Sequence, residues 1–256
     1  MTTIREFTTT NPGPVHLSLK QKSGKVSIAV DATAYLARVT VSTDADDGPG
    51  AEAVEQAKIS EIGQHLAVAV LVKGGSGGVM ITGNNYSSIN FSGGSGRVII
   101  NGVDVTDMVN GGTAGKSSTV TTHITLPLGS EVHMEAGTAD VTIKGALRVL
   151  DYSGTSGTLA ADEVGDCTVD LSSGTAQVRQ VTKRLDVNLS SGEFTLTAYD
   201  GSDARLHASS GNLRLHASKS SSGRLNVGVS SGNATITGAG HLDVRKRCSS
   251  GNIRVN

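Results

Sequence analysis

Residues 209–215 read Ser-Ser-Gly-Asn-Leu-Arg-Leu, and close variants of this motif return at a nearly constant interval along the second half of the chain. Taking the glycine of each copy from Gly157 to Gly251, successive glycines are 17, 18, 19, 21 and 19 residues apart. Such an interval is typical of one coil of a β-solenoid, in which each repeat packs only on its neighbours. The sequence therefore predicts an all-β fold, a parallel β-solenoid (β-helix) with coils of about 17–21 residues.

The hydrophobic pattern changes its parity at each glycine. Apolar residues stand seven, five and three positions before the glycine, and two and four positions after it. Because side chains alternate along a strand, this switch predicts a bend at the Ser-Gly step, after which a new strand again faces inward. Glycine suits such a bend because it adopts positive φ without steric cost. Around Gly192 the pattern consists of Leu185, Val187, Leu189, Phe194 and Leu196.

The serine directly before each glycine shares the parity of the inward-facing residues. We therefore predict that these serines stack as an internal hydroxyl ladder at one corner, beside the column of glycines. The alternative, a flexible Ser-Ser-Gly loop, would not keep the flanking positions constant. The ladder consists of Ser173, Ser191, Ser210, Ser231 and Ser250, with Gly174, Gly192, Gly211, Gly232 and Gly251.

The first half of the chain is less regular. Strands are expected at 15–19, 25–30, 37–42 and 64–73, with a short helix after Asp47-Gly-Pro49. Residues 74–118 form a glycine- and serine-rich excursion, for which we expect mobility and one hairpin near Asn101-Gly102. We predict an N-terminal β region over 1–118, with this helix and excursion, and solenoid repeats over 119–256; one continuous domain is the alternative.

A longer stretch extends the pattern towards the N-terminus. Residues 123–145 read His-Ile-Thr-Leu-Pro-Leu-Gly-Ser-Glu-Val-His-Met-Glu-Ala-Gly-Thr-Ala-Asp-Val-Thr-Ile-Lys-Gly and lead into the Ser-Ser-Gly copies. This succession resembles the bacterial putative-adhesin β-strand-repeat family of unknown function, over about residues 15–256 and most clearly from 119 onward. The resemblance implies a β-solenoid after an N-terminal β region and, in some relatives, a link to cell-envelope stress systems. It implies no catalytic residues.

Composition limits the classes of function. A formal net charge of −1 gives no overall attraction to nucleic acid, and with 3% aromatic residues the core must be narrow and aliphatic. The N-terminus lacks the pattern of a secretory signal, and the apolar run at 66–72 is far shorter than the roughly twenty residues of a membrane span. We expect a soluble cytoplasmic protein; export of a mature form is the alternative.

Several motifs that suggest small-molecule chemistry do not meet its requirements. Residues 111–117, Gly-Gly-Thr-Ala-Gly-Lys-Ser, lack the first glycine of a phosphate loop, and a strand-like segment follows instead of a helix. The histidine pairs His207 with His216 and His123 with His133 have no third ligand and are expected on the surface. No cofactor or metal is predicted.

Cysteine spacing argues against a disulfide. Cys167 and Cys248 fall four coils apart, roughly 19 Å at the spacing of stacked strands, which is beyond disulfide reach. Both are expected to point inward as small apolar residues.

Carboxylates support an alternative function. Some parallel β-helices cleave polysaccharides with paired acids, so a carbohydrate-active enzyme, glycosidase or lyase, is the second hypothesis. Such enzymes use aromatic platforms, for which the repeats offer only Tyr152 and Tyr199. The candidate acids are Asp162, Glu163, Asp166 and Asp170.

Charge is distributed unevenly along the chain. Residues 201–256 have a balance of +6 and residues 31–61 one of −5. We predict a surface for an anionic partner near the C-terminus; the alternative is that these residues only keep exposed strands soluble. The surface consists of Arg205, Arg214, Arg224, Arg245, Lys246, Arg247 and Arg254.

The favoured function is a non-catalytic binding or scaffolding protein, associated with the cell envelope and self-associating. Its expected partners are a protein or envelope component, or a peripheral anionic surface, but no nucleic acid. Lys246 stands where other copies have Val or Leu, and a charge at a strand edge hinders continued growth. We therefore expect a dimer over an endless filament.

Overall fold

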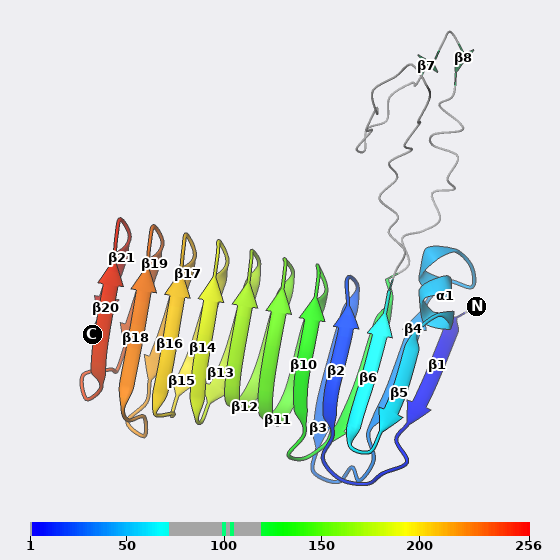
Figure 1. Ribbon diagram of the computed structural model, residues 1–256, viewed down its shortest axis with the longest axis horizontal. Coiled ribbons are helices and arrows are strands. Elements are labelled where there is room, and N and C mark those ends of the chain that lie inside the picture. Colours follow the sequence, from blue (N-terminus) through cyan, green and yellow to red (C-terminus); the bar gives the residue numbers. More distant parts are fainter. Residues whose placement is uncertain (1, 72–98, 101–102, 105–118) are drawn as a thin grey trace.

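The structure is a computed structural model that describes residues 2–71, 99–100, 103–104 and 119–256, with 99–100 and 103–104 described by their backbone alone. The chain forms a flattened β-solenoid, whose coils each place one strand on a front face and one on a rear face (Figure 1). Apart from a two-stranded pairing within 99–104, all described strands belong to one 19-stranded sheet. The predicted all-β solenoid is confirmed.

In the regular coils, front-face strands lead into the Ser-Gly corners, and rear-face strands follow them. In spatial order the front face contains β5 (Lys58–Ile62), β6 (His65–Val70), β2 (His16–Gln21), β10 (Glu131–Ala136), the second halves of β11 (Asp140–Gly154) and β12 (Thr158–Leu171), β14 (Arg184–Leu189), β16 (Asp203–Ala208), β18 (Arg224–Val229) and β20 (Asp243–Cys248). The rear face contains β1 (Thr3–Thr8), β4 (Arg38–Thr43), β9 (Thr121–Pro127), β3 (Lys25–Asp31), the first halves of β11 and β12, β13 (Thr175–Val181), β15 (Glu193–Tyr199), β17 (Asn212–Ala217), β19 (Asn233–Thr237) and β21 (Asn252–Val255).

Near the N-terminus the coils do not stack in sequence order. β2 pairs with β6 on one side and β10 on the other, and β3 likewise pairs with β9 and β11. The coil of β2 and β3 therefore lies between the coil of β6 and β9 and the start of the regular series. Strands from both predicted regions, 1–118 and 119–256, interleave in one sheet.

Antiparallel strands close the N-terminal end of the stack. β5 runs antiparallel to β6, and β4 runs antiparallel to β9 with β1 on its outer side. The predicted helix is α1 (Gly48–Glu55), which follows Asp47, has proline in its first turn and buries Ala51, Ala53 and Val54. Of the elements at this end of the stack, the sequence pattern predicted β4 and α1 but neither β1 nor β5.

Part of the predicted excursion is described. β7 (Ile99–Ile100) pairs antiparallel with β8 (Val103–Asp104), on either side of the hairpin predicted at Asn101-Gly102. The remainder of 74–118, including the phosphate-loop-like motif at 111–117, lies outside the described residues.

The interior consists of straight rows of apolar side chains. On the front face Val187, Leu206 and Val227 stack in one row, and on the rear face Phe194 stacks on Leu213; all five are buried. Burying each such side chain stabilises the fold by about 1.5–3 kcal/mol. The predicted core of inward strand positions is confirmed.

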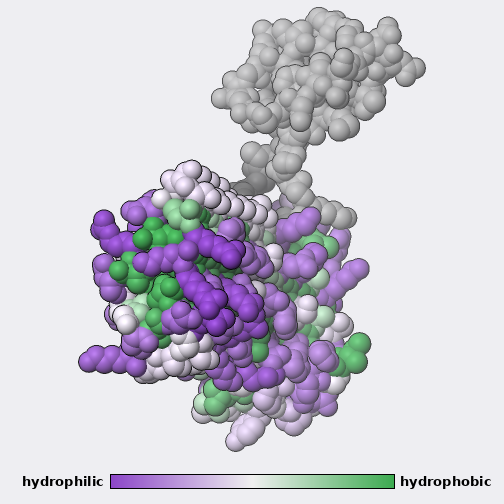
Figure 2. All heavy atoms as spheres, turned by 60° about the vertical axis from the view of Figure 1, so that its left-hand side comes forward, coloured by the Kyte–Doolittle hydropathy of each residue, from purple (hydrophilic) through white to green (hydrophobic). Residues whose placement is uncertain are grey.

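The last coil leaves its inward-facing side chains partly exposed. Within the described chain β20 pairs with β18 alone, and Val244, Ile253 and Val255 are only partly buried. Figure 2 turns this end forward and shows apolar patches beside hydrophilic side chains. Lys246 continues the inward row of Val227 and is exposed there.

The prediction that the ladder serines point inward is wrong. The serines do stack from coil to coil, and the backbone N–H of Ser210, for example, donates to the carbonyl of Ser190 at 2.8 Å. However, the side chains of all five ladder serines are exposed, whereas Gly192, Gly211 and Gly232 are buried. The alternation of a strand does not continue through the corner, so the glycine turns inward and the serine outward.

Close packing explains most of the glycine column. Gly157 and Gly174 have positive φ, 109° and 117°, but the later glycines do not. At Gly211 an added Cβ would lie 2.5 Å from the carbonyl oxygen of Gly192. That oxygen also accepts a hydrogen bond from the backbone N–H of Asn212 at 2.9 Å, so the two coils cannot separate without breaking it.

We expect Gly211→Ala to lower the free energy of unfolding by about 1–3 kcal/mol, because the new methyl group overpacks the corner. Urea unfolding followed by circular dichroism measures the change. Ser210→Ala is the matched control and should shift stability by less than about 0.5 kcal/mol, since its hydroxyl is exposed. Equal losses in both variants would contradict the close-packing explanation.

Candidate functional site

The structure does not gather the seven predicted basic residues into one surface. Arg214 and Arg254 project from the rear face, and Lys246 continues an inward row at the last coil. The other four lie on the outer side of the front face: Arg205, Arg224, Arg245 and Arg247.

Register arranges the outer side chains of the front face in rows that run across the strands. The first row alternates in sign, and its members form ion pairs, Arg184 with Asp203 at 3.9 Å and Arg224 with Asp243 at 3.3 Å. The next two rows carry most of their charge as arginine. The rows are Arg184, Asp203, Arg224 and Asp243; Asp186, Arg205, Asn226 and Arg245; and Asn188, His207, Gly228 and Arg247.

A hollow of about 400 Å³ lies over the second and third rows. We call it the arginine hollow. Gly228 forms part of its floor, because it lacks a side chain among long neighbours; a Cβ there would lie 3.0 Å from Nδ1 of His207. Arg205, Arg245 and Arg247 contribute the positive charge around this floor.

Internal ion pairs neutralise these arginines only in part. Arg205 lies 3.8 Å from Asp203, and Arg245 lies 3.6 Å from Asp243; both are exposed pairs of the kind that contributes little. Arg247 has no ion pair within the described part of the chain. The one acid that lines the hollow, Asp186, lies 3.8 Å from Arg184. The hollow therefore offers guanidinium groups, which suit carboxylate, sulfate and phosphate.

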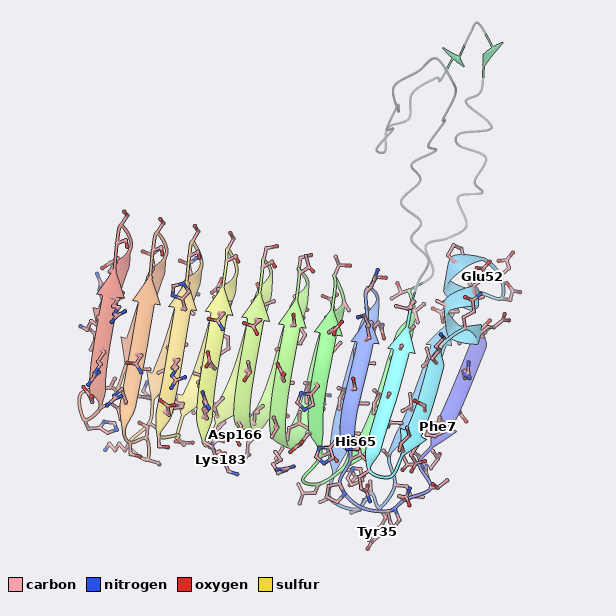
Figure 3. All side chains as sticks on the ribbon, viewed as in Figure 1. Phe7, Tyr35, Glu52, His65, Asp166 and Lys183 are labelled. Carbon is pink, nitrogen blue, oxygen red and sulfur yellow. The ribbon has the colours of Figure 1, made fainter. Side chains whose placement is uncertain are left out.

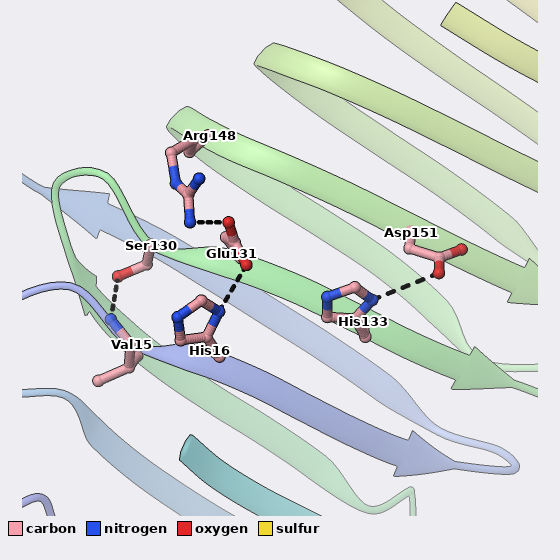
Figure 4. Close-up of polar contacts among 7 residues, drawn as sticks. All are labelled: Val15, His16, Ser130, Glu131, His133, Arg148 and Asp151. Atoms are coloured by element: carbon pink, nitrogen blue, oxygen red, sulfur yellow. Dashed lines mark hydrogen bonds and ion pairs between the residues drawn. The ribbon is translucent and has the colours of Figure 1, made fainter. Parts of the chain in front are cut away.

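A second polar cluster joins the early front-face strands (Figure 4). The carboxylate of Glu131, largely buried, accepts from Nδ1 of His16 at 2.5 Å and forms an ion pair with Arg148. The neighbouring Ser130 hydroxyl donates to the carbonyl of Pro127 at 2.7 Å and accepts from the backbone N–H of Val15 at 3.1 Å. The serine is thus not oriented towards His16, and the cluster fastens β10 to β2 and β11. The sequence pattern does not predict this cluster, because His16 and Glu131 are 115 residues apart.

The candidate histidines lie at the surface, as predicted. His207 and His216 are exposed, and His216 contacts the hydroxyl of Thr237 at 2.9 Å. His133 lies 3.3 Å from Asp151. Among the described residues no group of three or more metal-ligating side chains is found. The sequence pattern does not place His207 in the arginine hollow, because its neighbours there come from separate coils.

Two carboxylates of the enzyme hypothesis make structural contacts. Asp162 accepts from the backbone N–H of Gly145 at 3.1 Å, and Asp170 accepts from the amide of Asn188 at 2.9 Å. Figure 3 places Asp166 near the corner at which the chain returns to the front face. Tyr152 and Tyr199 are fully buried, so neither ring can form the aromatic platform that this hypothesis requires.

The two cysteines differ in exposure. Cys167 is buried, and this burial, together with the charge of Asp151, raises the pKa of its thiol to about 12. The prediction that Cys248 is enclosed is wrong. It does continue the inward row of Val229, but it belongs to the last coil and is exposed.

Comparisons with known proteins concern the fold. The chain matches no protein family and no curated protein in sequence. Similar solved structures include a putative adhesin from Bacteroides fragilis, with 12% identity, a TM-score of 0.46 and coverage of 100% of this chain and 97% of that one. Another, from Parabacteroides merdae, has 9% identity, a TM-score of 0.49 and coverage of 100% and 96%. A putative lipid binding protein from Parabacteroides distasonis has 12% identity, a TM-score of 0.49 and coverage of 99% and 96%. Proteins described as putative adhesins are thus among the structural neighbours.

Within the described residues, no helix has the length and apolar character needed to cross a membrane.

We expect iodoacetamide to alkylate Cys248 and leave Cys167 unmodified in the folded protein near neutral pH, because the Cys167 thiol is buried and protonated. Mass spectrometry should show one added group in the native state and two after unfolding in guanidinium. Rapid double labelling of the native protein would contradict the enclosed position of Cys167.

Proposed function

We propose that this protein is a non-catalytic binding module that uses the front face of its last coils to bind an anionic partner, such as a component of the cell envelope. The observation that supports this function is the arginine hollow, where Arg205, Arg245 and Arg247 surround a floor opened by Gly228.

The geometry favours binding over catalysis. The charged and amide side chains that line the hollow are three arginines, two asparagines and one carboxylate already close to an arginine, so they match an anion by charge and hydrogen bonding. The sheet beneath fixes the spacing of the backbone positions that carry these side chains, so no backbone segment has to be ordered on binding.

We expect Arg205→Ser/Arg247→Ser to weaken binding of dextran sulfate by about tenfold or more, since each charge-assisted hydrogen bond contributes about 1.5–3 kcal/mol. Affinity is measured by biolayer interferometry on the full chain, at low and high salt. Neutral dextran serves as the ligand control.

The matched protein control is Lys219→Ser/Arg254→Ser, which removes the same charge from exposed positions outside the hollow. An equal loss of affinity for dextran sulfate in both variants would mean that net charge alone causes binding, and it would contradict a localised site. No binding of dextran sulfate by the native protein would overturn the proposed function.

We also propose that self-association is electrostatic and limited to a dimer. The acidic segment 31–61 lies towards the N-terminal end of the stack, and the basic segment 201–256 lies at the other end (Figure 1). If two copies lie side by side in opposite directions, the acidic end of each copy faces the basic end of the other. This arrangement has twofold symmetry and is closed, so no further copy is added. Lys246, Arg245 and Arg247 at the β20 edge disfavour further stacking.

Size-exclusion chromatography with light scattering should show a dimer at low salt that dissociates at high salt, because exposed charges are screened. A monomer at both salt concentrations would contradict the dimer, and higher oligomers would contradict its closure.

A further inference from the structure

A second hollow, of about 240 Å³, adjoins the arginine hollow on the front face. We call it the serine hollow. The two share Asn188 and His207 in their linings. The serine hollow is lined by the first serine of successive Ser-Ser-Gly corners, Ser172, Ser190 and Ser209, together with Asp170. These are the outward neighbours of the serines for which an internal ladder was expected.

We propose that the two hollows together form one extended site for an acidic oligosaccharide. This inference rests on the proposed function, because it specifies which anion the arginine hollow accepts. An envelope glycan as its source requires the exported form that the sequence leaves as an alternative.

Length is the first argument for an oligomeric ligand. The combined lining runs from Ser153 on β11 to Arg247 on β20 and crosses β12, β14, β16 and β18 between them. Five inter-strand spacings of about 4.8 Å give about 24 Å, which exceeds a single phosphate or lipid headgroup.

The chemistry of the lining is the second argument. Serine hydroxyls and the Asn188 amide can exchange hydrogen bonds with sugar hydroxyls, and the arginines suit carboxylate or sulfate substituents. The carbon stems of Arg205 and Arg245, with the ring of His207, offer surface for the apolar faces of sugar rings. A ligand that combines many hydroxyls with negative charge matches both ends of the site.

An acidic peptide fits less well. The apolar residues along the floor, such as Val187, Leu206 and Leu189, have buried side chains, so the site offers no pocket for an apolar side chain. Both hollows lie on a sheet face, whose backbone groups already pair between strands, so a peptide cannot add as a further strand there.

Paired serines at each corner supply a matched test. Ser190→Ala/Ser209→Ala removes hydroxyls that line the serine hollow, whereas Ser191→Ala/Ser210→Ala removes exposed hydroxyls one residue away that do not. Circular dichroism and thermal unfolding verify that both variants are folded. Binding is measured by isothermal titration calorimetry with hexagalacturonate, galacturonate monomer, inorganic phosphate and poly-L-glutamate of matched charge.

We expect hexagalacturonate to bind at least tenfold more tightly than the monomer and than poly-L-glutamate. Ser190→Ala/Ser209→Ala should weaken hexagalacturonate binding about fivefold or more without changing phosphate binding, and Ser191→Ala/Ser210→Ala should change neither. Gly228→Leu, which fills the floor of the arginine hollow, should weaken binding of both hexagalacturonate and inorganic phosphate.

Two outcomes would overturn this inference without overturning the proposed function. Equal binding of hexagalacturonate and poly-L-glutamate would show that charge alone is recognised, and an unchanged affinity in Ser190→Ala/Ser209→Ala would exclude the serine hollow. In either case dextran sulfate binding through Arg205 and Arg247 would still support the proposed function. If no polyanion binds, both proposals fail.

Discussion

The structure depends on the contact between glycines of neighbouring coils. The carbonyl oxygen of one corner glycine accepts a backbone hydrogen bond from the next coil and occupies the space of that coil's missing Cβ. At Gly192 this oxygen belongs to Gly174, and at Gly232 it belongs to Gly211. Because the corners approach so closely, each coil aligns with the last, and all inward rows follow from that alignment.

The same alignment creates the outer surface. A strand has a period of two residues, so equivalent outward positions of successive coils fall in one row. Arg205 and Arg245 share a row with Asn226 between them, and Gly228 separates His207 from Arg247 in the next. The arginine hollow thus arises because one coil supplies an amide and a glycine where its neighbours supply long side chains. A change in coil length that shifted the register would disperse it.

Much of the fold could be predicted from short-range patterns. The alternation around Gly192 and Gly211 gives the strands and their inward faces, and Asp47-Gly-Pro49 gives the helix start. The prediction of inward-facing serines at the corners is wrong because the alternation of inward and outward side chains applies only along a strand. Beyond Leu189 the backbone bends, and Ser191 turns outward. The order of the first coils could not be predicted, because the pairing of β2 with both β6 and β10 joins segments far apart in sequence.

The coil, its core and the concentration of basic residues near the C-terminus can be predicted from the sequence, because they depend on residue type and local spacing. Which of those basic residues lie together depends on how the coils stack. Arg214 and Arg254 project from the rear face, while Arg205, Arg245 and Arg247 join Asn188 and His207 on the front face. Contacts between coils depend on register across stacked strands, and a residue's neighbours there are set by the lengths of the intervening turns.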